Sequence, residues 1–152
     1  MIDPSLASFL EEGLSLHIGT RDADLNPQGG RAAALAVEPD GAHVIVYVPE
    51  RAMTRMRAQL ESIGLAAVSI GRPVDERACQ VKGVVVEIRP AREDEQGLVA
   101  AQWDGYLRQL ELIGIQRGIS AGWSMWPAVA VRIRVTAVFE QTPKPDTGYA
   151  IA

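Results

Sequence analysis

Apolar residues alternate with polar or small ones along several stretches of the chain, which is the pattern of strands that bury one face. In the first such stretch, Leu14, Leu16 and Ile18 alternate with polar or small neighbours. The sequence predicts six strands, over residues 14–19, 31–38, 43–48, 65–71, 79–89 and 129–139. The turn sequence PDGA separates the second and third of these, so we expect this pair to form a hairpin.

Three other segments have the spacing of helices. Asp3 and Pro4 are typical of a helix start, and Gly13 is typical of the residue after a helix end. The second helix is predicted within residues 49–64, with an apolar stripe of Met53, Met56, Leu60 and Ile63. The third is predicted over residues 97–114, with an apolar side of Val99, Trp103, Tyr106, Leu110 and Ile113.

The order of these elements favours one fold class. Six strands joined mostly by short connections are typical of a mainly β protein, here a six-stranded antiparallel barrel-like sheet with flanking helices. A doubly wound nucleotide fold needs a helix after nearly every strand, which this chain lacks. With 152 residues, the chain is expected to form a single domain over residues 1–152.

Composition and charge narrow the functional classes. A net charge of -4 argues against general nucleic-acid binding, which relies on a basic surface. No apolar stretch approaches the ~20 residues of a membrane span. The single cysteine, Cys79, fits a reducing compartment, and the acidic N-terminal segment is unlike a signal peptide. We therefore expect a cytoplasmic protein that binds neither nucleic acid nor membranes.

Common cofactor motifs are absent from the sequence. The chain has no G-x-G-x-x-G pattern after a strand, and it has no G-x-x-x-x-G-K-[ST] phosphate-binding loop. Two isolated histidines and one cysteine do not make a zinc site, which needs four ligands at short spacings. We therefore predict no metal site.

The segment 49–64, PERAMTRMRAQLESIG, concentrates arginines in an otherwise acidic chain. On a helix, Arg51 and Arg55 share a face, and Thr54 adds a hydroxyl group near the first turn. A helix N-terminus also offers free backbone N–H groups and a positive dipole end, so the segment suits a phosphate monoester. We expect Arg57 to lie on a solvated basic face of the helix. The same solvated face is the alternative role for Arg51 and Arg55.

Three further polar residues are candidates for the same site. Arg31 begins the second strand, whose hairpin partner leads into the arginine-rich helix, so we expect it near the same phosphate. Gln80 and Lys82 lie on one face of the long fifth strand among valines, where polar groups need partners. The edge of a flavin ring would provide such partners. A hydrogen-bonded barrel glutamine and an exposed lysine are the alternatives.

Taken in order, these features resemble a known family. The hairpin, Thr54-Arg55 on an arginine-rich helix, and Cys-Gln-Val-Lys-Gly in a long strand resemble the pyridoxamine 5'-phosphate oxidase-like FMN-binding split β-barrel family. Val138–Pro143 with Gly148 is similar to the F-x-Q-T-P-G-P-x-A-G ending of its smaller members. The resemblance covers residues 5–148 and rests on order and spacing.

This resemblance implies a homodimer with two FMN molecules in clefts between the subunits. It implies that Arg31 approaches the phosphate or ribityl chain and that Thr54 and Arg55 bind the phosphate. It further implies that Gln80 contacts the ring edge, while the backbone of Ala32, Ala33 and Ala34 runs along the ring.

Two departures qualify the functional expectation. Met56 stands where the family often has a lysine, a role that Arg51 or Arg57 would have to take over, and the R-x-H signature of true pyridoxamine phosphate oxidases is missing. We therefore expect an FMN-dependent oxidoreductase of unknown substrate, without pyridoxamine phosphate oxidase activity. The alternatives are a non-catalytic flavin or haem carrier and a cofactor-free dimeric scaffold. Deazaflavin and haem are the less favoured cofactors.

Two tryptophans have no role in these motifs. Trp123 and Trp126 lie in the segment before the last strand. They are predicted either to cover a planar ligand or to pack at a dimer interface, where tryptophan is enriched.

Overall fold

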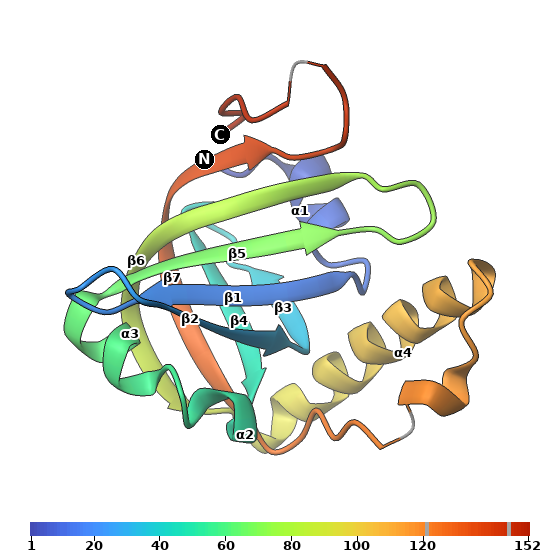
Figure 1. Cartoon of the computed structure of the whole chain (residues 1–152), viewed down its shortest axis with the longest axis horizontal. Helices are drawn as coiled ribbons and strands as arrows, with labels where there is room; N and C mark the ends of the chain where they lie inside the picture. Colours follow the sequence, from blue (N-terminus) through green and yellow to red (C-terminus); the bar gives the residue numbers. More distant parts are fainter. Residues whose placement is uncertain (121, 146) are drawn as a thin grey trace.

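A computed structural model of the protein describes residues 1–120, 122–145 and 147–152. Its strands form one antiparallel seven-stranded sheet in the order β2-β1-β5-β6-β7-β4-β3 (Figure 1). The strands are β1 (Ser15–Arg21), β2 (Pro27–Ala32), β3 (Ala34–Val37), β4 (His43–Pro49), β5 (Leu65–Gly71), β6 (Ala78–Pro90) and β7 (Ala128–Glu140). The mainly β class is confirmed.

The sheet curls into a half-barrel because β2 and β3 lie at its opposite edges but are joined only by Ala33. Ala32 pairs with Leu16 on β1, whereas Ala34 pairs with Tyr47 on β4. The single strand predicted over residues 31–38 is therefore two strands with different neighbours. This division raises the strand number from the expected six to seven, while the expected β3–β4 hairpin is confirmed.

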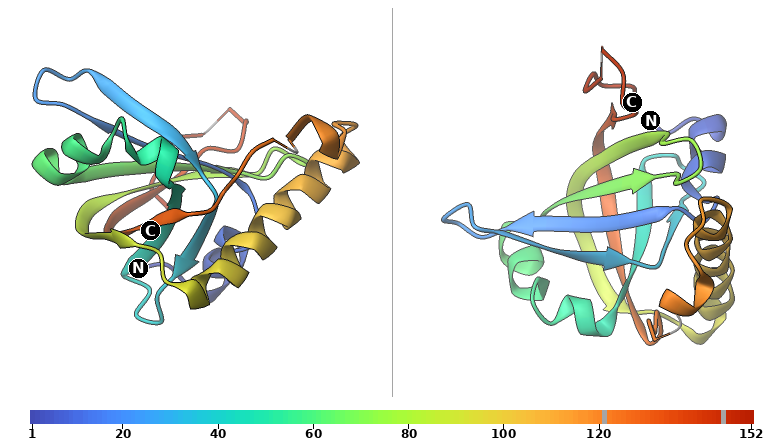
Figure 2. Two further views of the ribbon diagram at one scale, coloured as in Figure 1. Left: turned by 90° about the horizontal axis from the view of Figure 1, so that it is seen from below. Right: turned by 45° about the vertical axis from the view of Figure 1, so that its right-hand side comes forward.

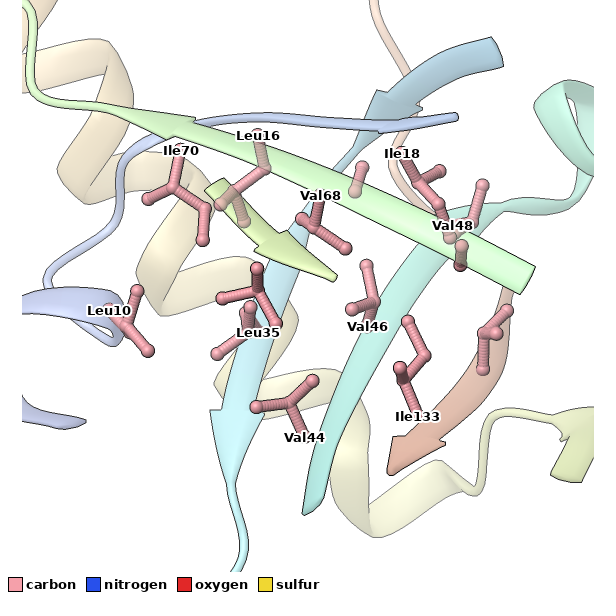
Figure 3. Packing of buried hydrophobic residues seen from close by; sticks show 14 of the residues in the cluster. Leu10, Leu16, Ile18, Leu35, Val44, Val46, Val48, Val68, Ile70 and Ile133 are labelled. Carbon is pink, nitrogen blue, oxygen red and sulfur yellow. The ribbon is translucent and has the colours of Figure 1, made fainter. Parts of the chain in front are cut away.

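The concave side of the curled sheet holds the main apolar core. Leu16, Val46 and Val68 come from three different strands and point into the same interior (Figure 3). Their sequence neighbours His17 and Ser69 are exposed, as strand alternation requires. The outer face of β1, β5 and β6 therefore carries the polar and small residues of these strands.

A β-bulge changes which residues of β7 face the core. Lys82 pairs with Ala137 but Gly83 pairs with Val135, so Thr136 is the extra residue. Beyond the bulge Val138 is buried, whereas Phe139 is only partly buried. Strict alternation over the strand predicted at residues 129–139 would keep one apolar face throughout, but the bulge changes that face after Val135.

Two of the predicted helices form as expected. In α1 (Pro4–Leu10), the Asp3 carboxylate accepts a hydrogen bond from the Leu6 backbone N–H at 2.9 Å. Helix α4 (Gln96–Leu112) buries Val99 and Tyr106 and follows a short 3-10 helix, η1 (Glu93–Glu95). Ile113, predicted on the apolar side, lies beyond the helix end and is 48% exposed. Another 3-10 helix, η2 (Arg117–Ser120), follows.

The helix predicted within residues 49–64 is interrupted. It consists of α2 (Glu50–Met53) and α3 (Arg57–Ile63), which are separated by a turn at residues 54–56. Met53, Met56 and Leu60 are buried as the apolar stripe predicted. Both views in Figure 2 place α2 and α3 on one side of the curled sheet and α4 on the other.

The C-terminal segment folds back on β7. Phe139 forms a β-bridge with Ala150, and the Ile151 N–H donates to the Val138 carbonyl at 2.7 Å. Asp146 in this segment lies outside the described residues. Among the helices that the structure describes, none is long and apolar enough to cross a bilayer.

Candidate functional site

Four polar residues form a row across the outer face of the sheet. Arg31 on β2 lies opposite His17 on β1, and His17 lies opposite Ser69 on β5. Ser69 in turn lies opposite Gln80 on β6. Because adjacent strands are ~4.8 Å apart, Arg31 and Gln80 are separated by about 14 Å on the same face. The fold thus brings together two candidates that lie far apart in the sequence.

Arg31 is enclosed by aromatic rings. Its guanidinium carbon lies 5.0 Å from the ring centre of Tyr106 and 5.2 Å from that of Trp123, within the range of cation–π contacts. Trp103 contacts both rings, stacked on Trp123 and tilted against Tyr106. The Nη1 atom of Arg31 is buried and has no hydrogen-bond partner among the described residues. An unpaired buried donor of a charged group is costly, and an anion would satisfy it.

Arg31 and the turn at residues 54–56 lie on different sides of β2. A side chain at Gly30 would contact Ala52 and Met56, so α2 and the turn cover the inner face of β2. Arg31 extends from the outer face and pairs with β1. The expectation that Arg31 shares a hairpin with the strand before α2 is therefore wrong, because that strand pairs with β3 instead.

Thr54 does not lie in the first turn of a helix, where the sequence predicts it, but in the turn between α2 and α3. Helix α2 has four residues, and Thr54 follows its last one, where its hydroxyl donates to the Glu50 carbonyl at 3.5 Å. Arg55 lies in the turn with an exposed side chain. Arg57 begins α3, and its Nε donates to the Glu61 carboxylate at 3.0 Å, so it has a local partner.

The three alanines after Arg31 are buried. Ala32 belongs to the main core, whereas Ala33 and Ala34 belong to a second apolar cluster. The second cluster also contains Tyr47, Val99, Met125, Ala128 and Ala130. Trp126 packs against it, so both tryptophans before β7 have partners within the chain.

Gln80 and Lys82 have weak partners on the outer face. The Gln80 side-chain amide donates to the Ser69 hydroxyl at 3.4 Å, near the upper limit for a hydrogen bond. The Lys82 ammonium lies 4.8 Å from the ring centre of Phe139 and is otherwise exposed. Neither residue is fixed by a strong interaction in the described part of the chain.

Beside the row, the outer face is hollowed by a trough of about 350 Å³. It is lined by Ser15, His17, Ser69, Ile70, Gly71, Ala78, Cys79, Gln80 and Gln141. Partial desolvation lowers the pKa of His17 below its usual value, and the positive charge of Arg31 lowers it further. His17 was not among the predicted site residues, although strand alternation alone places it on the outer face.

A second hollow of about 600 Å³ lies further along the same strands and includes Lys82. It is lined by Gly19, Thr20, Arg21, Pro27, Gln28, Leu65, Ala66, Ala67, Lys82, Gly83 and Thr136. Lys82 therefore borders a different hollow from Gln80.

Glu38, Asp40 and His43 come within metal-binding distance of one another, but local bonds account for them. Glu38 forms two hydrogen bonds of 2.8 Å with Arg132. Asp40 accepts from the Ala42 N–H and lies 2.6 Å from the His43 ring. The cluster is a hydrogen-bonded turn between β3 and β4.

Several solved structures share this fold. A structure described as an F420 reductase aligns with a TM-score of 0.59 at 20% identity, covering 88% of this chain and 95% of that one. A putative pyridoxamine 5'-phosphate oxidase from Lactobacillus delbrueckii aligns with a TM-score of 0.55 at 14% identity over 90% and 92% of the two chains. An FMN-binding protein from Syntrophomonas wolfei aligns with a TM-score of 0.50 at 11% identity over 90% and 88%.

These similarities confirm, at the level of the fold, the resemblance to pyridoxamine 5'-phosphate oxidase-like proteins. They extend over nearly the whole length of both chains in each comparison. No protein-family model matches the sequence, and a search of curated proteins gives no match.

Proposed function

We propose that this protein is a flavoprotein that binds FMN and acts as an oxidoreductase. The observation that carries the proposal is the buried Nη1 atom of the Arg31 guanidinium, which lacks a hydrogen-bond partner among the described residues. A phosphate oxygen would supply the missing acceptor and the missing negative charge. A protein of this fold that is described as FMN-binding supports the choice of ligand.

The edge of the sheet offers a place for the phosphate. β2 is an edge strand, with Arg31 on its outer face and the turn that carries Thr54 and Arg55 against its inner face. A phosphate at the free edge of β2 would be within reach of side chains from both faces of this strand. Arg31 and Arg55 would supply charge-assisted donors, and Thr54 would supply a hydroxyl donor.

The remaining candidate residues would hold the ring. The backbone of Ala32, Ala33 and Ala34 follows Arg31 directly, and Gln80 and Lys82 face outward on β6. In such a protein the bound flavin supplies the redox chemistry, while the chain binds and orients it. We also propose a homodimer, to be checked by light scattering after gel filtration.

The choice between FMN and a deazaflavin depends on affinity. The similar structure described as an F420 reductase makes a deazaflavin the second candidate. The purified protein is titrated with each cofactor, and binding is followed through the fluorescence of Trp103 and Trp123, which lie beside Arg31. The two dissociation constants distinguish FMN from a deazaflavin. Tighter binding of FMN is the expected result, and tighter binding of F420 would replace FMN in the proposal.

The first test is an absorption spectrum of the purified protein, recorded before and after addition of FMN and desalting. We expect a retained flavin band, which bleaches when NADH or NADPH is added with a suitable reductase and recovers with an electron acceptor. A bound flavin that cannot be reduced would identify a carrier. A protein that stays colourless after addition of FMN would contradict the proposal and support the cofactor-free scaffold.

A further inference from the structure

Helix α4 carries two of the aromatic rings that surround Arg31. Tyr106 contacts the guanidinium directly, and Trp103 stacks on Trp123, the other ring beside it. Both Tyr106 and Trp103 belong to α4, and Tyr106 is buried. The position of these rings over β2 therefore depends on how the helix is fixed along its own axis and around it.

Gln102 is the residue through which α4 is hydrogen-bonded to the sheet. Its side-chain amide donates to the Leu35 carbonyl at 2.8 Å, and its Oε1 accepts from the Leu35 N–H at 3.0 Å. Both bonds are buried, and Gln102 is 8% exposed. Within the described part of the chain, no other side chain of α4 bonds to a strand, because Gln109 donates to Gly13 before β1.

The pair of bonds to Leu35 fixes the helix more closely than apolar packing would. Leu35 lies on β3, an edge strand, so the amide of Gln102 takes the place of a further strand. Two directional bonds to one residue set both the height and the rotation of the helix. The close approach of Gly13 to the Gln102 backbone, where a side chain would collide, brings the two segments together without interlocking side chains.

This attachment is coupled to Arg31 by the spacing on both segments. Gln102 and Tyr106 are four residues apart on α4 and share a face. Leu35 and Arg31 are also four residues apart, on the two sides of Ala33, which joins β2 to β3. A slip of one residue would turn the side chains of α4 by about 100° and remove Tyr106 from the guanidinium.

We propose that Gln102 is a positioning residue for the anion site, because its two bonds to Leu35 hold α4 in the register that keeps the Arg31 guanidinium beside Tyr106. Gln102 acts through Tyr106 and Arg31. The consequence for phosphate binding rests on the proposed function, whereas the consequence for the position of Arg31 does not.

Two substitutions at Gln102 test the proposal, with a control on the same edge strand. Gln102→Met keeps the length of the side chain but removes both bonds, and Gln102→Asn shortens its reach by one methylene group. The control is Glu11→Ala, which removes the 2.7 Å bond from the Val37 N–H to a residue outside α4. Circular dichroism and thermal melting verify folding. Gln102→Asn serves for all measurements if Gln102→Met does not fold.

The first measurement needs no ligand, because His17 reports on the position of Arg31. Desolvation lowers the pKa of His17, and the positive charge of Arg31 opposite it lowers the pKa further. The imidazole is titrated by NMR, with His43 as an internal reference. Gln102→Met should raise the pKa of His17, as Arg31→Met does, and should add nothing in the Arg31→Met background. Glu11→Ala should leave the His17 titration unchanged.

The second measurement compares FMN with riboflavin, which lacks the phosphate. Gln102→Met should raise the Kd for FMN roughly fivefold and leave the Kd for riboflavin almost unchanged. In the Arg31→Met background, the same substitution should change neither Kd. An equal loss of affinity for both ligands would mean that Gln102 supports the fold in general, which would overturn the role in phosphate binding.

The titration of His17 separates this inference from the proposed function. The inference is overturned if Gln102→Met leaves the pKa of His17 unchanged, or raises it by the same amount when Arg31 has already been replaced. A protein that binds no flavin would refute the proposed function, while the His17 titration would still decide whether Gln102 positions Arg31.

Discussion

The guanidinium of Arg31 on β2 lies 5.0 Å from the centre of the Tyr106 ring on α4. This contact places at the edge of the sheet a charged group with a buried nitrogen that has no hydrogen-bond partner in the part of the chain that the structure describes. Stacking on a ring leaves the in-plane N–H donors of a guanidinium free for an anion. Arg31 is therefore oriented by its aromatic neighbours without being neutralised by them.

Replacing Arg31 with methionine should weaken FMN binding by about 1.5–3 kcal/mol, because a charge-assisted hydrogen bond is lost. Riboflavin binding should change little, since riboflavin has no phosphate. Isothermal titration with both ligands checks this, and Arg108→Met on the exposed side of α4 is the control. An equal loss for both ligands would remove the phosphate role from Arg31.

Arg55 and Arg57 form a matched pair for testing the turn. Arg55 is exposed in the turn, whereas Arg57 has Glu61 as a partner. Arg55→Ala should weaken FMN binding by about 1.5–3 kcal/mol. Arg57→Ala should change it by less than about 0.5 kcal/mol, because exposed ion pairs contribute little. Fluorescence titration measures both, and equal effects would show that only the general charge of the segment matters.

The substitution Met56→Lys should lower the free energy of unfolding of the protein and should not improve phosphate binding. The family pattern suggests a lysine at this position, but the Met56 side chain is fully buried against β2. Burying an unpaired ammonium group there should cost about 3 kcal/mol or more. Urea denaturation measures the loss, with exposed Arg55→Lys as the control. An unchanged midpoint would show that the lysine reaches solvent.

Glu95 should make the protein sensitive to acid. Hydrogen bonds from Arg89, with further ones from Arg92 and Tyr47, lower the pKa of this buried carboxyl group to about 2. A folded-state pKa below the unfolded value stabilises the fold above the unfolded pKa of about 4.5, on the order of 3 kcal/mol. This contribution should be lost as the pH falls from about 5 to 2.

The corresponding measurement is the free energy of unfolding between pH 7 and pH 2 for the wild-type chain and Glu95→Gln. The variant should be less stable at pH 7 and should show a shallower decline in acid. Parallel curves for the two proteins would mean that other carboxylates carry the acid sensitivity.

Helices and strands with strong local patterns were predictable from the sequence, but the elements that each of them pairs with or packs against were not. The apolar stripe of Met53, Met56 and Leu60 correctly gives the buried side of residues 49–64. Because residues three and four apart remain on that side when the helix is interrupted, the stripe could not reveal the turn after Met53. The bulge at Thr136 likewise depends on pairing with β6, which the sequence of β7 does not contain.

The candidate site shows the same limit. Arg31, Thr54, Arg55 and Gln80 were chosen from residue type and resemblance, and alternation correctly places Gln80 and Lys82 on one face. The row that joins Arg31 to Gln80 depends on the registers of β1 with β2 and β5. Register between strands far apart in the chain is set by packing, so His17 could not be recognised as their neighbour.

The single residue between β2 and β3 also decides where any ligand can be bound. Since Ala33 ties the two outermost strands together, the sheet cannot widen without breaking pairs such as Ala32–Leu16 or Ala34–Tyr47. The interior is already filled by apolar side chains. Unlike in barrels that enclose their ligands, any small molecule that binds this protein would have to lie on the outer wall or at the rim of the sheet, where neighbouring protein surfaces have access to it.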